Sequence, residues 1–127
     1  MKVKFGDICF ATHDVLRMRT FYELVFGVKG TGDEYNSGIT LDGLTILFDN
    51  ATMLQNVPSF KYASGQSSGN LFVDFNADDV DAEYERLISL GVKTLNEPIT
   101  HPWGARSFQF RDPDGNILNF RSSSDKS

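Results

Sequence analysis

Few side chains in this sequence belong to the common catalytic motifs. Cys9 is the only cysteine, so neither an intrachain disulfide nor a cluster of thiolate zinc ligands can form. The two histidines, His13 and His101, stand far apart in the chain. No G-x-S-x-G, H-E-x-x-H or C-x-x-C motif, no phosphate-binding glycine loop and no evident set of nucleophile, histidine and acid occurs. The chemistry must therefore come from single polar and aromatic side chains on strands and loops.

Asp7 lies on a predicted strand at residues 5–11. Its neighbours alternate, with Ile8 and Phe10 on one face and Asp7 and Cys9 on the other, so at least one side of the strand is expected to be buried. Cys9 has no cationic neighbour that would activate its thiol, and we interpret it as a small buried side chain. Asp7 fits two interpretations: a carboxylate that lines a cavity, or a solvated carboxylate at a strand edge.

The same alternation returns at residues 70–76. Phe72 and Asp74 share one face of this predicted strand, and the opposite face is apolar, with Leu71, Val73 and Phe75. We expect these apolar residues to be buried between a sheet and a helix. Asp74 is equally compatible with a cavity wall and with a solvated sheet edge.

A predicted loop at residues 101–104 contains a histidine and the only tryptophan. His101 precedes Pro102, and histidines in such loops are usually solvated. Trp103 has no apolar run around it, so it fits a pocket wall as well as a core position. Arg106 follows on the next predicted strand, where it can pair with a carboxylate, with an anionic ligand group or with water.

A stretch near the C-terminus is typical of a β-hairpin with a tight turn. Pro113 presets φ for the first corner of the turn, and Gly115 can adopt the positive φ that closes it. The flanking residues 107–110 and 117–120 alternate and are rich in aromatic and β-branched side chains. Asn119, on the second of these strands, is either an ordinary polar strand residue or a site residue.

Helix and turn signals divide the chain into two similar halves. Asp14 and Asp79 each stand where a helix N-cap is expected, because a carboxylate there can accept the free N–H groups of the first turn. Gly27 and Gly91 end these helices. Leu16, Phe21, Leu24 and Val25 recur at helical spacing in the first helix. Further strands are expected at residues 28–34, 38–41 and 44–48, with Asp42-Gly43 as a hairpin turn.

Each half therefore reads as a strand, a helix and three strands, and matching aspartate–valine and aspartate–glycine pairs recur in both. We predict an α+β fold of two βαβββ modules in a single domain, at about residues 4–50 and 70–121. A linker without clear periodicity is expected at about 51–69 and a polar tail at 122–127. Ile8, Phe10, Leu118 and Phe120 are expected to be buried between sheet and helices.

The composition is that of a globular protein and argues against several classes of partner. The chain has 127 residues, of which 40% are hydrophobic and 23% charged, as in an ordinary single domain. Its net charge of −5 disfavours a nucleic acid or an anionic membrane as partner. No apolar run approaches the roughly 20 residues needed to span a bilayer, and Gly6-Asp7 interrupts any signal-peptide core. We therefore expect a cytoplasmic protein.

Four short motifs stand in a definite order along about residues 5–121. They are Asp14…Phe21-Tyr22-Glu23…Phe26-Gly27, Asp79-Val80-Asp81-Ala82, Trp103-Gly104 with Arg106, and Asp112-Pro113-Asp114-Gly115-Asn116. In these motifs and their spacing, the chain resembles the vicinal oxygen chelate superfamily of glyoxalases, bleomycin-resistance proteins and extradiol dioxygenases. The resemblance implies two modules whose curved mixed sheets surround a cavity, with the helices outside. It also implies a homodimer, since the superfamily commonly dimerises.

In the metalloenzymes of that superfamily, histidine, glutamate or glutamine side chains face the cavity from four positions. The matching residues here are Asp7, Leu47, Phe72 and Asn119, with Asn70 in place of Phe72 if the register shifts. A metal of this type needs at least three oxygen or nitrogen ligands, and Leu47 and Phe72 offer none. The resemblance therefore implies a member that holds no metal, and we expect no other cofactor.

The predicted function is binding of a small organic molecule, as in the bleomycin-resistance branch. The expected ligand-binding residues are Asp7, Phe72, Asp74, His101, Trp103, Arg106 and Asn119. The alternative is a metal-dependent lyase, isomerase or dioxygenase of the glyoxalase type, whose ligands would regroup from Asp7, Asn70 or Asp74, His101 and Asn119. A third hypothesis is a cofactor-free enzyme with Asp7 as general base, for which the sequence offers no partner residue.

The predicted ligand is a flat cation. Asp7 and Asp74 have no neighbour of opposite charge in the sequence, and Arg106 is the one cation expected nearby. A carboxylate held partly out of water is unfavourable unless another charge compensates it. A cationic ring would provide that charge and stack on Phe72 or Trp103.

Overall fold

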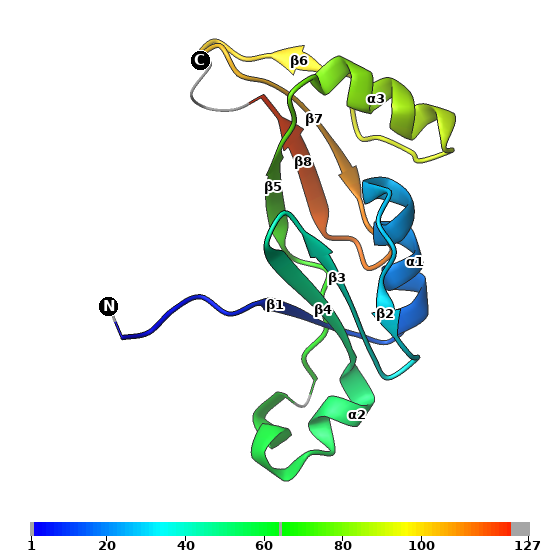
Figure 1. The fold of residues 1–127 in the computed structure, drawn as a ribbon, viewed down its shortest axis with the longest axis vertical. Helices are drawn as coiled ribbons and strands as arrows, with labels where there is room; N and C mark the ends of the chain where they lie inside the picture. The colour runs from blue at the N-terminus through cyan, green and yellow to red at the C-terminus, as the bar shows by residue number, and fades with distance from the viewer. Residues whose placement is uncertain (1, 64, 123–127) are drawn as a thin grey trace. The chain divides into compact units, whose positions relative to one another are not determined.

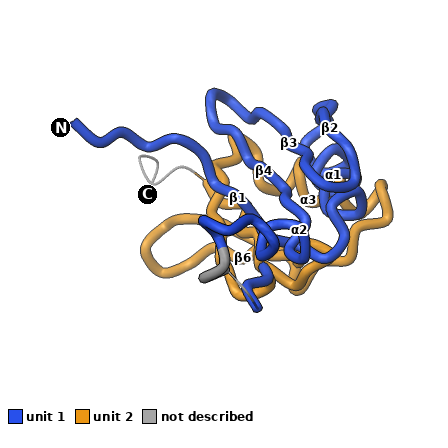
Figure 2. The backbone as a smooth tube through the Cα atoms, turned by 90° about the horizontal axis from the view of Figure 1, so that it is seen from below, with its two compact units in different colours: residues 1–68 blue, residues 69–127 orange. Residues whose placement is uncertain are grey.

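The computed structural model describes residues 2–63 and 65–122, without the side chains of 61–63. The chain forms two compact units, residues 1–68 and 69–127, which are coloured separately in Figure 2. Each unit is described by itself below. Within the described residues, no helix is long and apolar enough to cross a membrane.

The first unit contains a four-stranded mixed sheet in the order β1-β4-β3-β2 (Figure 1). Its strands are β1 (Ile8–Thr12), β2 (Thr31–Gly32), β3 (Asn36–Leu41) and β4 (Leu44–Asn50). β1 runs parallel to β4, and the other pairs are antiparallel. The β3–β4 hairpin turns at Asp42 and Gly43, whose φ angles of 43° and 84° are those of the predicted tight turn.

Helix α1 (Val15–Phe26) begins and ends at the two predicted residues. The Asp14 side chain accepts a hydrogen bond from the Arg17 N–H, and Gly27 closes the helix in the left-handed conformation. The buried face differs from the predicted one by about one residue: it consists of Val15, Met18, Tyr22 and Val25, whereas Leu16 and Leu24 are exposed. The sequence pattern left both faces plausible because apolar residues occur on each.

The core of the first unit lies between α1 and one face of its sheet. Helix α1 contacts β3 and β4, and the ring of Tyr22 lies 5.1 Å from that of Phe48 and 6.0 Å from that of Phe10. Phe10, Ile46 and Phe48 are buried as expected for one face of alternating strands. The residues between them, such as Leu47 and Asp49, therefore point to the opposite face of the sheet.

The stretch expected to be a linker contains two short helices. Helix α2 (Ala51–Gln55) follows β4 directly, because the Asn50 side chain accepts a hydrogen bond from the Met53 N–H and caps it. A 3₁₀ helix, η1 (Pro58–Ala63), comes next, and both belong to the first unit. A five-residue helix carries too little periodicity to stand out in a sequence.

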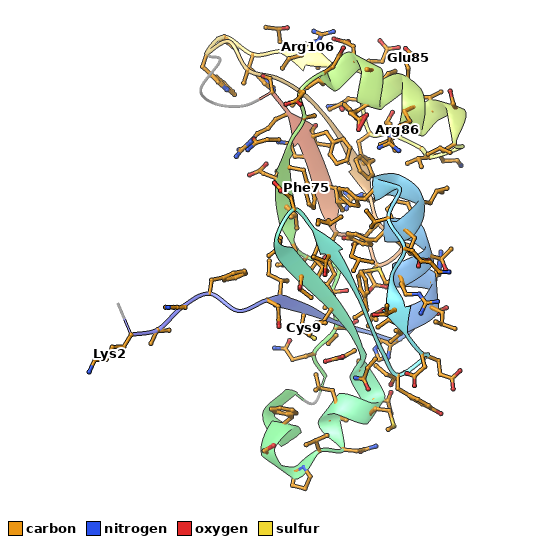
Figure 3. The ribbon with its side chains drawn as sticks, in the orientation of Figure 1. Lys2, Cys9, Phe75, Glu85, Arg86 and Arg106 are labelled. Atoms are coloured by element: carbon orange, nitrogen blue, oxygen red, sulfur yellow. The ribbon has the colours of Figure 1, made fainter. Side chains whose placement is uncertain are left out.

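The first residues of the predicted strand at 5–11 are not part of a strand. Residues 2–7 extend from the start of β1 as an exposed segment, with Lys2 labelled at its far end (Figure 3). Val3 and Phe5 are 77% and 70% exposed, so this segment buries little apolar surface in its own chain.

The second unit repeats the arrangement, with a sheet in the order β5-β8-β7-β6. Its elements are β5 (Phe72–Asn76), helix α3 (Val80–Ser89), β6 (Ile99–Thr100), β7 (Arg106–Arg111) and β8 (Ile117–Arg121). Asp79 caps α3, as predicted, by accepting from the Ala82 N–H. With the first unit, this confirms the predicted α+β fold of two βαβββ modules.

The core of the second unit lies between α3 and the sheet. Phe108, Phe110, Leu118 and Phe120 are buried, and α3 contacts β7 and β8. Val73 and Phe75 are half-buried, which fits the predicted orientation of β5, and Phe75 packs edge-on against Phe120. Leu71 was expected to be buried but is 46% exposed, because it precedes β5 instead of belonging to it.

A buried polar pair holds the turn between β7 and β8. Asp112 accepts hydrogen bonds from the backbone N–H groups of Asp114 and Asn116 and from the Asn116 side chain. The Asn116 side-chain oxygen in turn accepts from the backbone N–H groups of Gly69 and Leu71, at 2.7 and 3.1 Å. The turn therefore also fixes the chain that leads into β5.

Replacing Asn116 by alanine should destabilise the protein by about 3 kcal/mol, because the part-buried N–H groups of Gly69 and Leu71 would lose their acceptor and the buried Asp112 carboxylate would lose its side-chain donor. Urea unfolding of the Asn116→Ala variant measures this change. The exposed Asn56 provides the control, since Asn56→Ala should change stability by less than about 0.5 kcal/mol. Equal stabilities of the two variants would contradict the role given to Asn116.

Candidate functional site: the polar faces of the two sheets

In the second unit, the sheet face opposite α3 carries a row of polar side chains. Asn119 on β8 lies between Asp74 on β5 and Gln109 on β7 in the register of the strands. All three alternate with core residues, so they share the face that does not pack on the helix. The structure therefore brings together Asp74 and Asn119, two of the predicted site residues.

The hydrogen bonds along this row have a single consistent direction. Because the Asp74 carboxylate only accepts, the Asn119 amide nitrogen must face it, at 2.9 Å. The Asn119 oxygen then accepts from the Gln109 side-chain nitrogen at 2.5 Å, and the Gln109 oxygen accepts from Asn96 at 2.7 Å. The side-chain amides of Asn119 and Gln109 therefore stabilise each other and leave little hydrogen-bonding capacity for a ligand.

His101 and Trp103 form a flat aromatic surface beside this row. Their rings are stacked, with centroids 4.6 Å apart and planes 4° from parallel. Ser107 Oγ lies 2.8 Å from His101 Nε2 and accepts from Gln109 at 3.3 Å, so the buried hydroxyl can donate to a neutral imidazole. Trp103 is 67% exposed, which leaves one face of the stacked pair available to a planar molecule.

Asp74 already has a cationic partner, which sequence reasoning missed. Arg121 Nη1 lies 3.2 Å from Asp74 Oδ2, and Arg121 also donates to the Asn76 side chain. The two charged side chains are 40% and 38% exposed, so the pair adds little stability, at most about 1 kcal/mol. It nevertheless compensates the Asp74 charge. Arg121 follows the alternation of β8 and could have been placed on this face from the sequence.

Arg106, in contrast, lies on the helix-facing side of β7. Arg106 donates two hydrogen bonds of 2.9 Å to the Asp81 carboxylate at the start of α3. Figure 3 labels Arg106 near this helix. The hydrogen bond to Arg106 lowers the pKa of Asp81, and the same contact raises the pKa of Arg106. Arg106 therefore ties the helix to the sheet and does not lie with Asp74, Asn119 and His101.

Phe72 and Asp7, two further predicted site residues, belong neither to the row of polar side chains nor to the His101–Trp103 surface. Phe72 begins β5 on the same face as Asp74, opposite Ile117, and its ring is exposed. Asp7 lies in the exposed segment before β1, so it does not line a sheet face.

The corresponding face of the first sheet carries a different set of residues. Leu47 on β4 lies between Cys9 on β1 and Gly38 on β3. Asp49, two residues further along β4, accepts hydrogen bonds from the Cys9 thiol at 3.0 Å and from the Asn36 side chain at 2.8 Å. None of these was predicted as a site residue except Leu47, which was matched to a metal-binding position. The alternation of Leu47 and Asp49 with Ile46 and Phe48 was the available signal.

Cys9 is exposed, contrary to the expectation that it is a small buried side chain. Partial desolvation, the hydrogen bond to Asp49 and the negative charges of Asp49 and Asp7 raise the pKa of this thiol to about 12. The thiol is thus a hydrogen-bond donor and a weak nucleophile at neutral pH.

A hollow of about 590 Å³ lies on this unit, along β3 and β4. It is lined by Lys29, Thr31, Gly32, Asn36, Ser37, Gly38, Ile39, Thr40, Thr45, Leu47 and Asp49. Its size falls in the range of about 300–1,000 Å³ that is usual for small-molecule sites.

The four positions that would hold a metal do not provide a ligand set. Leu47 and Phe72 have no donor atom, and Asp7 lies outside the strands. Among the described residues, no group of three or more histidine, cysteine, aspartate or glutamate side chains is arranged to hold a metal ion. The residues present therefore do not fit the metal of the related enzymes.

The repeated βαβββ units and their polar sheet faces define a class that the comparisons identify. The family model of the Glyoxalase/Bleomycin resistance protein/Dioxygenase superfamily matches residues 4–120, and the chain belongs to this superfamily.

One relative is similar to part of the chain in sequence, and several solved structures share its fold at about 20% identity. Uncharacterized protein YraH of Bacillus subtilis is 37% identical over 59 residues, which is 46% of each protein, less than half of that relative's length. A glyoxalase/bleomycin resistance protein/dioxygenase from Nocardioides has a TM-score of 0.78 at 20% identity, covering 96% of this chain and 84% of that one. Lactoylglutathione lyase from Agrobacterium tumefaciens has a TM-score of 0.75 at 20% identity, covering 95% and 94%. At this identity the likeness shows the fold and leaves the activity open.

Removing the Asp49 charge should lower the pKa of the Cys9 thiol, since that charge favours the protonated form. The Asp49→Asn variant should therefore react with iodoacetamide faster at pH 8.5, by about tenfold for each unit by which the pKa falls. The control is Asp42→Asn, the same charge change in the β3–β4 turn, where asparagine tolerates the positive φ. If Asp42→Asn accelerated alkylation as much as Asp49→Asn, the effect would come from net charge.

Proposed function

We propose that this protein binds a small organic molecule with a planar group, and that the group stacks on the His101–Trp103 pair. The observation that supports the proposal is the parallel stacking of these rings at 4.6 Å with Trp103 largely exposed. Ser107 and the amide row behind it hold His101 in place, so a ligand would meet a surface that is already ordered. Sequestration of a toxic compound, as in the bleomycin-resistance branch, is the biological role that such binding would serve.

This sheet face does not select the sign of the ligand's charge. The prediction of a flat cation depended on an uncompensated carboxylate, and Asp74 is compensated by Arg121. A cationic ring would therefore have to displace Arg121 to gain that contact. Stacking on an aromatic surface, in contrast, is available to neutral, anionic and cationic rings, at about 0.5–1.5 kcal/mol beyond the area buried.

The catalytic alternatives have less support from the site. A glyoxalase-type lyase, isomerase or dioxygenase would need its metal ligands to regroup from Asp7, Asn70 or Asp74, His101 and Asn119. Among the described residues, however, no group of three or more histidine, cysteine, aspartate or glutamate side chains is arranged to hold a metal ion, and Asn119 donates its amide to Asp74. A general-base mechanism at Asp7 lacks a defined partner, because that residue lies in the exposed segment before β1. We therefore keep binding as the proposed function.

Planar molecules should quench the fluorescence of Trp103, the only tryptophan, in a saturable way. Nicotinamide, nicotinate and 1-methylnicotinamide share one ring and are neutral, anionic and cationic respectively, so together they separate stacking from charge preference. The His101→Ala variant should bind them about fivefold more weakly, since it removes the ring that orients Trp103. His13→Ala, at the exposed start of α1, should leave binding unchanged. Linear quenching by all three probes, or equal affinity in His101→Ala, would rule out the stacking site.

We further propose that the protein forms a homodimer, which would cover the exposed Val3 and Phe5 of the N-terminal segment. Sedimentation velocity at micromolar concentration should show a dimer, and the Phe5→Ser variant should shift the population toward monomer. A monomeric wild-type protein at that concentration would contradict the proposal.

A further inference from the structure

The hollow on the first sheet has the features of a second binding site, with a chemistry unlike that of the His101–Trp103 surface. Its floor is apolar. Leu47 provides the side chain, which lies over Gly38 on the neighbouring strand, since an added Cβ at Gly38 would stand 2.9 Å from Leu47 Cδ2. The hydroxyl groups of Thr40 and Thr45, 3.4 Å apart, lie among its lining residues. A ligand here would meet hydrocarbon from below and polar groups at the side.

Asp49 contributes a carboxylate to this hollow, and neutral groups are its hydrogen-bond partners. One oxygen accepts from the Cys9 thiol and the other from the Asn36 amide. Among the side chains that the structure describes, no cationic group forms an ion pair with Asp49, although Lys29 also lines the hollow. Asp49 is half-buried, so its charge is incompletely solvated.

Two carboxylates of the second unit, those of Asp74 and Asp81, differ from Asp49 in this respect. Asp74 pairs with Arg121, and Asp81 pairs with Arg106, each within 3.2 Å. The Cys9 thiol responds to the charge at Asp49, since the hydrogen bond and the charges of Asp49 and Asp7 add to desolvation in raising the pKa of Cys9 to about 12. The Asp49 carboxylate therefore carries its charge without a cationic partner among the described side chains, and a cation bound beside it would be stabilised.

We propose that the hollow binds an organic ammonium ion with a short apolar body. The ammonium group donates hydrogen bonds to the Asp49 carboxylate, and the hydrocarbon lies over the Leu47 side chain. An ammonium suits the site better than a guanidinium, because Cys9 and Asn36 already occupy one position on each Asp49 oxygen and hinder bidentate pairing. The proposal does not depend on stacking at His101 and Trp103.

The test is a titration of ¹⁵N-labelled protein with n-butylammonium chloride, followed by NMR at constant ionic strength. Backbone amide signals of residues that line the hollow, such as Thr40, Thr45 and Leu47, should shift in a saturable way. Asp49→Asn should weaken binding at least about tenfold, the effect of losing a charge-assisted hydrogen bond. The neutral analogue 1-butanol should bind the wild-type protein more weakly by a similar factor.

Asp42→Asn is the matched control, because it removes the same charge outside the lining of the hollow and should leave the affinity unchanged. If Asp49→Asn fails to fold, Leu47→Lys replaces it. That variant puts an ammonium group of the protein beside Asp49 and should abolish the shifts.

Equal weakening by Asp42→Asn and Asp49→Asn, equal binding of 1-butanol, or the absence of saturable shifts would each overturn the proposal. Butylammonium has no ring, so it also reports on this hollow separately from the planar probes. Loss of nicotinamide binding alone would count against the proposed function, and loss of butylammonium binding alone against this inference.

Discussion

The polar face of the second sheet depends on the buried pair of Asp112 and Asn116. These residues are 4% and 0% exposed. If either side chain were removed, the partner side chain would be left with an unsatisfied polar group in the interior, which is unfavourable. Through Asn116 the pair holds the backbone at Gly69 and Leu71, and so sets where β5 begins. Because side chains alternate along a strand, a shift of one residue in β5 would turn Asp74 toward the helix and Phe75 toward solvent. One turn thus determines which residues lie beside Asn119.

The two sheets use the same framework with different charge compensation. Cys9 and Leu47 are paired in the first unit as Asp74 and Asn119 are in the second. In the second unit, a carboxylate, two amides and an arginine neutralise and saturate one another, so the exposed rings of His101 and Trp103 are what remains available. In the first unit, the carboxylate on this face is that of Asp49. Among the described side chains, only the neutral Cys9 and Asn36 donate hydrogen bonds to it. Equivalent sheet faces of the two modules therefore differ: that of the second unit presents exposed aromatic rings, and that of the first presents a carboxylate.

Sequence reasoning succeeded where a local rule has few alternatives. The caps at Asp14 and Asp79 and the turn at Asp42-Gly43 follow from the chemistry of a few adjacent atoms. It failed where partners lie far apart in the chain. Arg106 and Arg121 are both strand residues, and only the parity of their positions in β7 and β8 decides which one meets Asp81 and which meets Asp74. Asp49 was missed for a different reason, since the strand was expected only at residues 44–48, whereas β4 extends to Asn50 and so carries Asp49 on the same face as Leu47.

Leu47 shows how a fold shared with metalloenzymes can support another kind of recognition. A metal site draws one ligand from each of several strands, and apolar residues at two of the four matched positions leave two donors where at least three are needed. In the first unit, the apolar Leu47 side chain at one of these positions becomes a contact surface on the sheet face opposite α1. The Leu47 side chain lies over Gly38 on the neighbouring strand, and Asp49 adds charge two residues along β4, on the same face. Hydrophobic contact with one fixed charge can bind a small organic ion without any metal, and it requires only that the strands keep their register.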